Sequence, residues 1–267
     1  MQLYTRIIGQ GQPIIILHGL FGMSDNWVSI ANSLAQAGYC VHLPDLRNHG
    51  RSPHLASHRY TDMCDDLLEY SEQHGLSRFS LIGHSMGGKL AMIFGLLHPE
   101  LLEKLVIVDI APAAYDHSTS SFHAHLISTL LAIDLSSHTS RSTVRQQVLA
   151  ILQDEPLAMF ITKNLSRSDD SAKGLTWKPN LPVLKASLNH LMTGLDDLEL
   201  YAPCTIRTLF IKGSLSNYYL PEHEKNRHHF FPESSLVEVA NAGHWLHSER
   251  TEVFLDHVLS FLGDENA

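Results

Sequence analysis

Short apolar segments alternate with helix-length amphipathic segments along most of this chain, and this alternation limits its fold more than any other feature. Strand-length apolar runs occupy residues 13–19, 39–45, 79–85 and 104–112, with helical spacing between them. Strands that alternate with helices form βαβ units and a parallel sheet. We therefore expect an α/β protein with a mostly parallel central sheet flanked by helices. A strand over 3–9 is expected at one edge, and two more strands over 205–213 and 235–241 near the end.

The alternation stops between residues 113 and 201, where the sequence is helical in pattern, rich in Ser and His, and without a clear strand. An insertion after one strand of a parallel sheet lies over the carboxyl edge of the sheet, where ligands bind in open α/β sheets. We expect a core formed by 1–112 and 202–267 and a helical cap at 113–201 that shapes the substrate pocket.

Composition excludes several classes of function. A net charge of −9 argues against a nucleic-acid partner, because phosphate binding needs clustered Lys and Arg. Three widely spaced cysteines, Cys40, Cys64 and Cys204, favour free thiols in a reducing compartment. No signal-peptide pattern opens the chain and its apolar runs are too short to span a bilayer, so a cytoplasmic protein is expected. The 19 histidines lack metal-ligand spacing, and no metal is expected.

The segment GHSMG, residues 83–87, fits the pattern G-x-S-x-G between a strand and a helix. In this context the sharp turn holds the serine in a strained conformation and exposes its hydroxyl. The start of the following helix favours negative charge through its free N–H groups and dipole. Ser85 is therefore the predicted nucleophile.

A second segment, HGLFG, follows the apolar run at 13–17, and we call residues 18–22 the oxyanion loop. Acyl transfer needs backbone donors for the oxyanion of its tetrahedral intermediate, one directly after the nucleophile and one in a loop after an earlier strand. We assign these donors to the N–H groups of Met86 and Leu20, with Phe21 as the alternative to Leu20. His18 is expected to hold the loop by hydrogen bonding.

A third segment, NAGHWLHSE, precedes the final helix and carries the candidate base. A serine hydroxyl is a weak nucleophile unless a neighbouring base takes its proton, and imidazole suits this task near neutral pH. His244 is the expected base. His247, the competing choice, is interpreted as a residue at the start of the helix.

Five segments in order, HGLFGMSDNW, DLRNHGRSP, GHSMGGK, VDIAP and AGHWLH, resemble the α/β-hydrolase superfamily, and more closely its YbfF-type esterases. The resemblance covers nearly the whole chain apart from the cap. It implies an α/β-hydrolase fold, hydrolysis of small acyl esters or of acyl-CoA thioesters, and no cofactor.

The carboxylate of the triad is missing from its usual place. In most of this superfamily it lies in the loop after the penultimate strand, which here reads GSLSNYY, residues 213–219. The candidates that remain are Glu222, Glu224, Asp196, Asp197 and Asp109. Residues 222 and 224 follow a proline at a predicted helix start, and residues 196 and 197 precede the strand at the wrong end of the sheet. Asp109 ends the strand after that of the nucleophile, so we predict Asp109 as the acid.

Ser216 then takes the position that the acid usually holds. Matching to the subgroup places Ser216, rather than Ser214, at this position, where its hydroxyl can bond Asp109 or His244; the alternative is a loop serine that bonds its own backbone. Four residues are expected to line the substrate pocket: Phe21, Asn26, Trp27 and Trp245; for Asn26 and Trp27, aromatic core packing is the alternative. DLRNHGRSP is interpreted as a rigid turn, and Lys89 as an internal tether.

Together these features predict a serine hydrolase that cleaves small acyl esters through an acyl-enzyme, with acyl-CoA thioesters as further substrates. A carbon–carbon bond hydrolase or lyase-type enzyme on the same fold, and a ligand-binding protein with a vestigial site, remain alternatives because fold alone does not define activity. The expected partner is a small-molecule ester or thioester, and the oligomeric state is left open between monomer and dimer.

Overall fold

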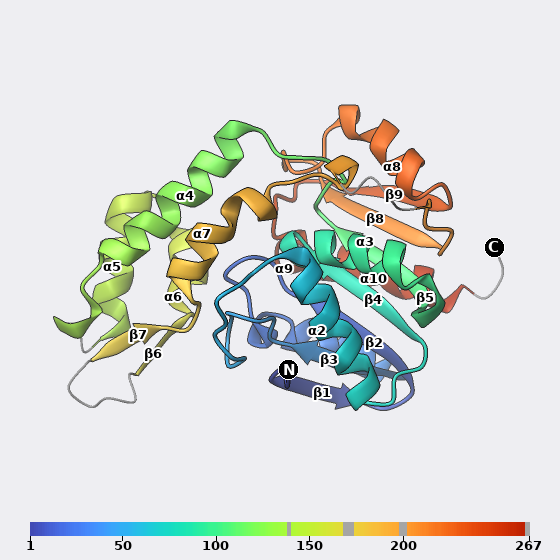
Figure 1. Cartoon of the computed structure of the whole chain (residues 1–267), viewed down its shortest axis with the longest axis horizontal. Coiled ribbons are helices and arrows are strands. Elements are labelled where there is room, and N and C mark those ends of the chain that lie inside the picture. Colours follow the sequence, from blue (N-terminus) through green and yellow to red (C-terminus); the bar gives the residue numbers. More distant parts are fainter. Residues whose placement is uncertain (138–139, 168–173, 198–201, 265–267) are drawn as a thin grey trace.

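The computed structural model describes residues 1–137, 140–167, 174–197 and 202–264. A seven-stranded sheet in the order β1-β3-β2-β4-β5-β8-β9 forms its centre (Figure 1). β1 pairs antiparallel with β3, and the other neighbouring strands are parallel, which confirms the predicted sheet. The strands are β1 Thr5–Gly9, β2 Gln12–Leu17, β3 Tyr39–Pro44, β4 Phe79–His84, β5 Leu102–Val108, β8 Thr208–Gly213 and β9 Ser234–Val239.

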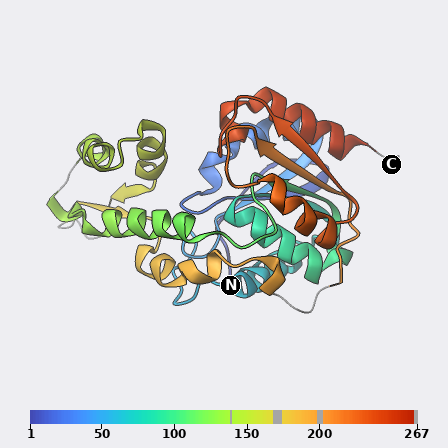
Figure 2. The same cartoon turned by 90° about the horizontal axis from the view of Figure 1, so that it is seen from above.

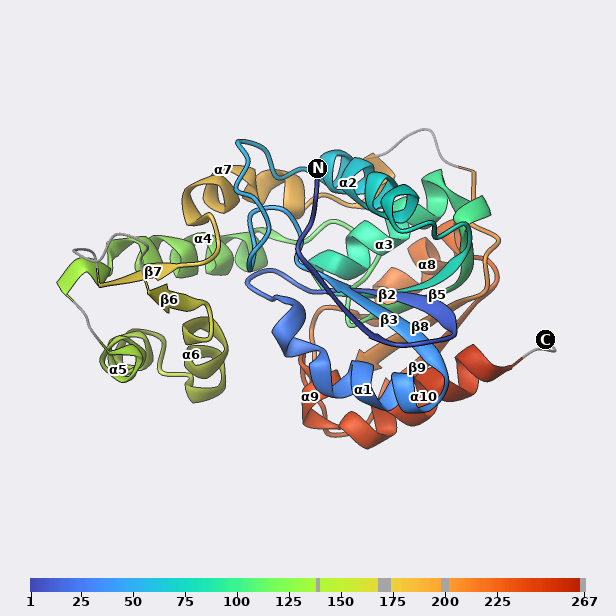
Figure 3. The same cartoon turned by 90° about the horizontal axis from the view of Figure 1, so that it is seen from below.

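Helices cover both faces of the sheet, as the long apolar runs of its inner strands require. α1 (Val28–Gln36) and α10 (Thr251–Gly263) lie on one face, with α2 (Tyr60–Gln73), α3 (Met86–Leu97) and α8 (Glu224–Phe230) on the other (Figure 3). Within β2, Ile14 and Ile16 pack toward α1 and α10, whereas Ile15 and Leu17 belong to the larger cluster on the opposite face. Each inner strand therefore contributes to two cores.

A cap lies beside the core (Figures 1 and 2), on the side where β4 ends (Figure 1). Its elements are α4 His117–Ala132, α5 Arg141–Leu152, α6 Glu155–Thr162, β6 Leu165–Arg167, β7 Leu175–Trp177 and α7 Leu181–Leu191. We expected a helical cap, but β6 and β7 pair antiparallel, so the cap also contains a short two-stranded sheet. Strands of three residues are too short to show an alternating pattern in the sequence.

Short elements complete the described chain: η1 Ser24–Asn26, η2 Pro99–Leu101, η3 Leu135–Ser137, η4 Leu195–Asp197, η5 Pro221–His223 and α9 Leu246–Glu249. Among the helices that the structure describes, none is both long and apolar enough to cross a membrane.

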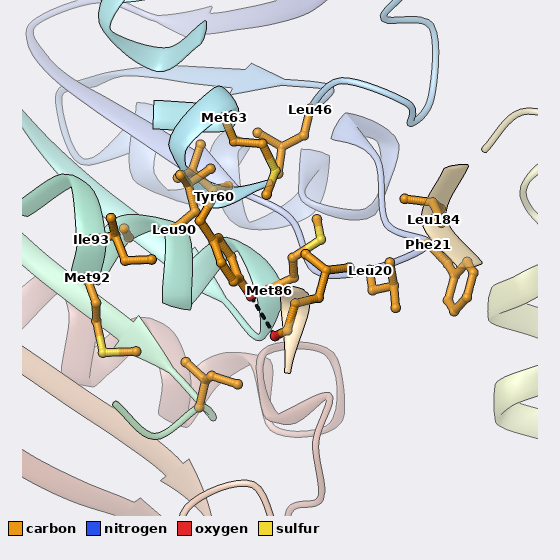
Figure 4. Packing of buried hydrophobic residues seen from close by; sticks show 14 of the residues in the cluster. Leu20, Phe21, Leu46, Tyr60, Met63, Met86, Leu90, Met92, Ile93 and Leu184 are labelled. Carbon is orange, nitrogen blue, oxygen red and sulfur yellow. Dashed lines mark hydrogen bonds between the residues drawn. The ribbon is translucent and has the colours of Figure 1, made fainter. Parts of the chain in front are cut away.

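Buried polar side chains hold the cap on the core. Lys89 on α3 donates from Nζ to the carbonyls of Ala113 and Thr193, at 2.7 and 2.6 Å, which lie on the two segments that join cap and core. Tyr60 on α2 donates to the Leu191 carbonyl at 3.1 Å, within the apolar cluster of Figure 4. The cap is therefore fastened to α2 and α3, two of the helices on the same face of the sheet.

Candidate active site

Ser85 lies in a sharp turn between β4 and α3. Its backbone has φ 54° and ψ −122°, a conformation that non-glycine residues rarely adopt. Glycines make this turn possible: a Cβ at Gly83 would lie 2.2 Å from the Gly87 carbonyl oxygen, and one at Gly87 would lie 2.4 Å from that of Leu17. Ser85 lines the main cavity, and its hydroxyl bonds to none of the described residues. The hydroxyl is thus available to a substrate.

The oxyanion loop lies directly against this turn, because a Cβ at Gly19 would come within 3.1 Å of Ser85 Cβ. The loop is closed by a bond from Gly22 N–H to the Gly19 carbonyl, at 2.9 Å. Phe21 N–H is occupied, since it donates to His49 Nε2 at 3.2 Å. Leu20 N–H, by contrast, has no acceptor within the described part of the chain. The geometry therefore favours Leu20 over Phe21 as a donor to substrate.

Met86 supplies a second free donor beside Ser85. It is the first residue of α3, so its N–H has no partner within the helix. The partial positive charge at the start of α3 also favours a negative charge next to Ser85. A carbonyl oxygen bound near Ser85 can therefore meet donors from both the loop and the helix.

His244 and Asp109 are joined by a hydrogen bond of 2.7 Å between Nδ1 and Oδ2. Asp109 follows β5, has a positive φ of 52°, and its side chain is fully buried, whereas that of His244 is 19% exposed at the cavity. Gly213 N–H donates to the other carboxylate oxygen at 2.9 Å. Because the carboxylate accepts from Nδ1, the Nε2 atom of His244 is left free to accept a proton.

Ser216 and Ser214 differ in their contacts. Ser216 Oγ donates to Asp109 Oδ2, the same oxygen that accepts the hydrogen bond from His244 Nδ1. Ser214 Oγ instead accepts from Asn241 N–H at 2.9 Å, so it supports the neighbouring loop. The structure thus brings Ser216, and not Ser214, to the carboxylate.

The other candidate acids lie elsewhere. Glu224 binds Arg227 and accepts from the Tyr219 hydroxyl, both at 2.7 Å. Glu222 and Asp196 are exposed, and the side chain of Asp197 lies outside the described residues. None of the three described acids contacts His244.

His84 and His247 surround the base without sharing its position. His84 Nε2 donates to the His244 carbonyl at 2.8 Å and so fixes the loop that carries the base. His247 stacks on Trp27, with ring centroids 4.2 Å apart, and its burial lowers its pKa to about 3. The bond to Asp109 is made by His244, and the ring of His247 packs on Trp27 instead.

A cavity of about 210 Å³ opens in front of Ser85 and is mostly apolar. The four predicted pocket residues Phe21, Asn26, Trp27 and Trp245 all line it. Asn26 also accepts from Met23 N–H at 2.9 Å, so it braces the segment that follows the oxyanion loop. The cap contributes six further residues: Phe122, His123, Leu126, Asp154, Leu157 and Phe160. The cap therefore forms much of the wall that meets the substrate.

Tyr218 also lies at the site, although no motif in the sequence marks it. Its ring stacks on that of His244, with centroids 3.9 Å apart and planes 22° apart, and its hydroxyl bonds His123 Nε2 at 3.3 Å. His123 belongs to the cap, and burial lowers its pKa to about 4. Tyr218 follows Ser216 by two residues, so one loop both contacts the carboxylate and covers the base.

The DLRNHGRSP turn, residues 45–53, forms the support beneath the oxyanion loop. Asp45 accepts from Ser24 N–H at 2.6 Å and from Arg51 N–H at 2.8 Å. Arg47 makes a bidentate pair with Asp66, with N–O distances of 2.5 and 2.8 Å. These contacts make the turn a scaffold.

Within the described residues, no three His, Cys, Asp or Glu side chains are grouped as a metal site.

A family model for the alpha/beta hydrolase fold matches residues 12–251. The chain belongs to this family, as its motifs, sheet and nucleophile turn predict, and it is an esterase-type member. It is 30% identical over 256 residues to esterase YbfF of Escherichia coli (strain K12), covering 94% of this chain and 93% of that protein. It is 35% identical over 255 residues to the sn-1-specific diacylglycerol lipase ABHD11 of Mus musculus, covering 93% and 80%. The solved structure of a marine microorganism esterase matches with a TM-score of 0.92 and 37% identity, covering 97% and 99%.

Proposed function

We propose that this chain is a serine hydrolase that cleaves small, uncharged acyl esters through an acyl-enzyme on Ser85. The observation that carries the proposal is the 2.7 Å bond between His244 Nδ1 and Asp109 Oδ2 at the cavity that Ser85 lines. A base held by a buried carboxylate, beside a free serine hydroxyl and free backbone donors, is the arrangement that acyl transfer requires.

In this mechanism Ser85 Oγ attacks the carbonyl carbon of the ester while its proton passes to His244 Nε2. Asp109 stabilises the resulting imidazolium, and the N–H groups of Leu20 and Met86 receive the oxyanion. His244 then protonates the departing alcohol, which leaves the acyl group on Ser85. A water molecule, deprotonated by His244, attacks the acyl carbon. The bond from that carbon to Ser85 Oγ then breaks, His244 returns the proton to Oγ, and the acid leaves.

The cavity favours uncharged esters over acyl-CoA thioesters. Its walls are mostly apolar, and none of the described residues that line it is Lys or Arg. Asp154, the one carboxylate among the described residues that line the cavity, would repel a phosphate. The phosphates of coenzyme A would therefore have to bind outside the cavity, where they add little to specificity.

A set of substrates with one acyl group tests this proposal: p-nitrophenyl butyrate, the butyryl thioester of N-acetylcysteamine, and butyryl-CoA. We expect turnover of the two uncharged substrates, with no gain in kcat/KM for butyryl-CoA over its phosphate-free counterpart. Ser85→Ala should lower kcat by a factor on the order of 10⁶. Full activity in Ser85→Ala would disprove the serine mechanism, whereas a strong preference for butyryl-CoA would disprove only the substrate class.

A further inference from the structure

The peptide groups of Phe21 are held from both sides of the active site. The core holds its N–H, which donates to His49 Nε2 at 3.2 Å. The cap holds its carbonyl, which accepts from Asn164 Nδ2 at 2.7 Å. Both partners are buried, with exposed fractions of 0% for His49 and 1% for Asn164. Phe21 has a φ of 61°, a left-handed conformation that a phenylalanine keeps only when its surroundings enforce it.

The contact from Asn164 determines the direction of Leu20 N–H through two peptide planes. In a trans peptide the C=O and N–H bonds point in opposite directions. Fixing the Phe21 carbonyl therefore directs Gly22 N–H the other way, where it donates to the Gly19 carbonyl at 2.9 Å. Fixing the Gly19 carbonyl in turn directs Leu20 N–H away from it. His18 Nδ1 donates to the same Gly19 carbonyl at 2.9 Å.

Asn164 is itself held firmly in the cap. It lies between α6 and β6, and its N–H donates to the Ile161 carbonyl at 3.0 Å. Its own carbonyl accepts from Lys178 N–H at 2.8 Å, next to β7. Its Oδ1 atom is buried and has no hydrogen-bond partner within the described residues. Burying a polar side chain costs free energy, and the one hydrogen bond that the Asn164 side chain makes is to the Phe21 carbonyl. This bond is therefore the reason we assign for an asparagine at this position.

We infer that Asn164 is a positioning residue through which the cap aligns the oxyanion donor of Leu20. This inference rests on the proposed function, since it concerns the same reaction. It adds a role for the cap: besides forming a wall of the cavity, the cap holds the backbone that stabilises the transition state. Asn164 touches neither substrate nor the reacting atoms and acts only through Phe21 and the loop.

The test compares Asn164→Ala and Asn164→Asp with Tyr60→Phe. Asn164→Asp keeps the shape of the side chain but replaces the donor by an acceptor, so the test survives if Asn164→Ala folds poorly. Tyr60→Phe is the matched control, because it also removes one buried hydrogen bond between core and cap, to Leu191, and does not line the cavity. Each variant is assayed for kcat and KM with p-nitrophenyl butyrate and for affinity to a trifluoromethyl ketone, which forms an oxyanion adduct with the nucleophile.

We expect both Asn164 variants to lose kcat by about 10- to 100-fold, because a misplaced donor stabilises the oxyanion poorly. KM should stay close to that of the wild type, since acylation and deacylation both pass through an oxyanion and slow together. Affinity for the ketone should fall by a similar factor, and hydrogen exchange in residues 18–23 should quicken. Tyr60→Phe should change none of these quantities.

Wild-type kinetics in both Asn164 variants, or losses no greater than in Tyr60→Phe, would overturn the inference. Ser85→Ala, assayed in parallel, separates this outcome from failure of the proposed function. If Ser85→Ala is inactive and the Asn164 variants are unimpaired, only the positioning role is wrong. If Ser85→Ala retains full turnover, the serine mechanism itself is wrong, and the exchange of residues 18–23 still reports whether Asn164 holds the loop.

Discussion

Asp109 Oδ2 accepts a hydrogen bond from His244 Nδ1 at 2.7 Å, although Asp109 ends β5 and the loop after β8 holds Ser216 instead of an acid. β5 and β8 are parallel neighbours, with Val108 paired to Ile211, so their carboxyl ends lie side by side. A carboxylate at the end of either strand can therefore reach the same imidazole. In this chain the carboxylate that contacts His244 comes from the end of β5.

Asp109→Asn is expected to lower kcat by about 10⁴-fold, because an amide neither holds the reactive tautomer of His244 nor stabilises its imidazolium. Glu222→Gln is the control, since Glu222 is exposed and does not contact His244, and it should leave kcat unchanged. Steady-state kinetics with p-nitrophenyl butyrate provide the comparison. Near-normal turnover in Asp109→Asn together with a collapse in Glu222→Gln would reverse the assignment.

Ser216→Ala should lower kcat by about tenfold, since a hydrogen bond to a charged group contributes on the order of 1.5 kcal/mol or more and Asp109 keeps its other donors. Ser214→Ala is a matched change in the same loop, and its hydroxyl bonds Asn241 instead of the carboxylate. It should leave kcat unaltered. Equal effects of the two substitutions would show that Ser216 acts only through loop stability.

Tyr218→Leu is expected to reduce kcat several-fold, because the ring stacked on His244 at 3.9 Å stabilises the imidazolium through its π face. Tyr218→Phe keeps the ring and loses only the bond to His123, so it should retain most activity. The ratio of the two kcat values isolates the stacking contribution. Similar losses in both variants would instead assign the effect to the hydroxyl and its contact with the cap.

The free energy of unfolding should fall as the pH drops below about 6.5, the usual pKa of an unfolded histidine. Burial and the nearby Arg47 lower the pKa of His58 to about 3 in the folded chain. Between these two values only the unfolded state binds the proton, so each pH unit removes about 1.4 kcal/mol through His58. In His58→Leu, the slope of the free energy of unfolding against pH, measured by urea denaturation over this range, should decrease by the equivalent of about one proton. An unchanged slope would show that His58 is not the buried neutral group involved.

The main elements of the fold could be predicted from sequence because they follow from local patterns. The apolar runs that form β2, β4 and β5 are buried on both faces. Each is followed directly by a polar residue of the site: His18, Ser85 or Asp109. The place of Asp109 at the site could be predicted by the same reasoning, since parallel strands place their carboxyl ends at one edge, and its role as the acid stays a prediction. The antiparallel pair of β6 and β7 in the cap could not be predicted, because each strand is only three residues long.

The residues of the candidate site that could not be predicted from the sequence depend on long-range contacts. Asn164 reaches Phe21 across 143 positions of sequence, and nothing in its neighbourhood marks it as different from any other loop asparagine. Tyr218 lies in the loop after β8, and its stacking on His244 depends on how this loop meets the loop that carries His244. No local pattern shows that the N–H of Phe21 donates to His49, because the two residues are 28 positions apart in the sequence.

The central claim, that Ser85 is the nucleophile of an esterase, is tested most directly by mapping the residue that an alkyl fluorophosphonate modifies. The account predicts one phosphonyl group on Ser85, with ester hydrolysis lost in step with labelling and no labelling of Ser85→Ala. Asp109→Asn should label far more slowly, because its base is no longer held. Inactivation with the label on another residue, or full ester turnover by protein whose Ser85 is labelled, would contradict the account.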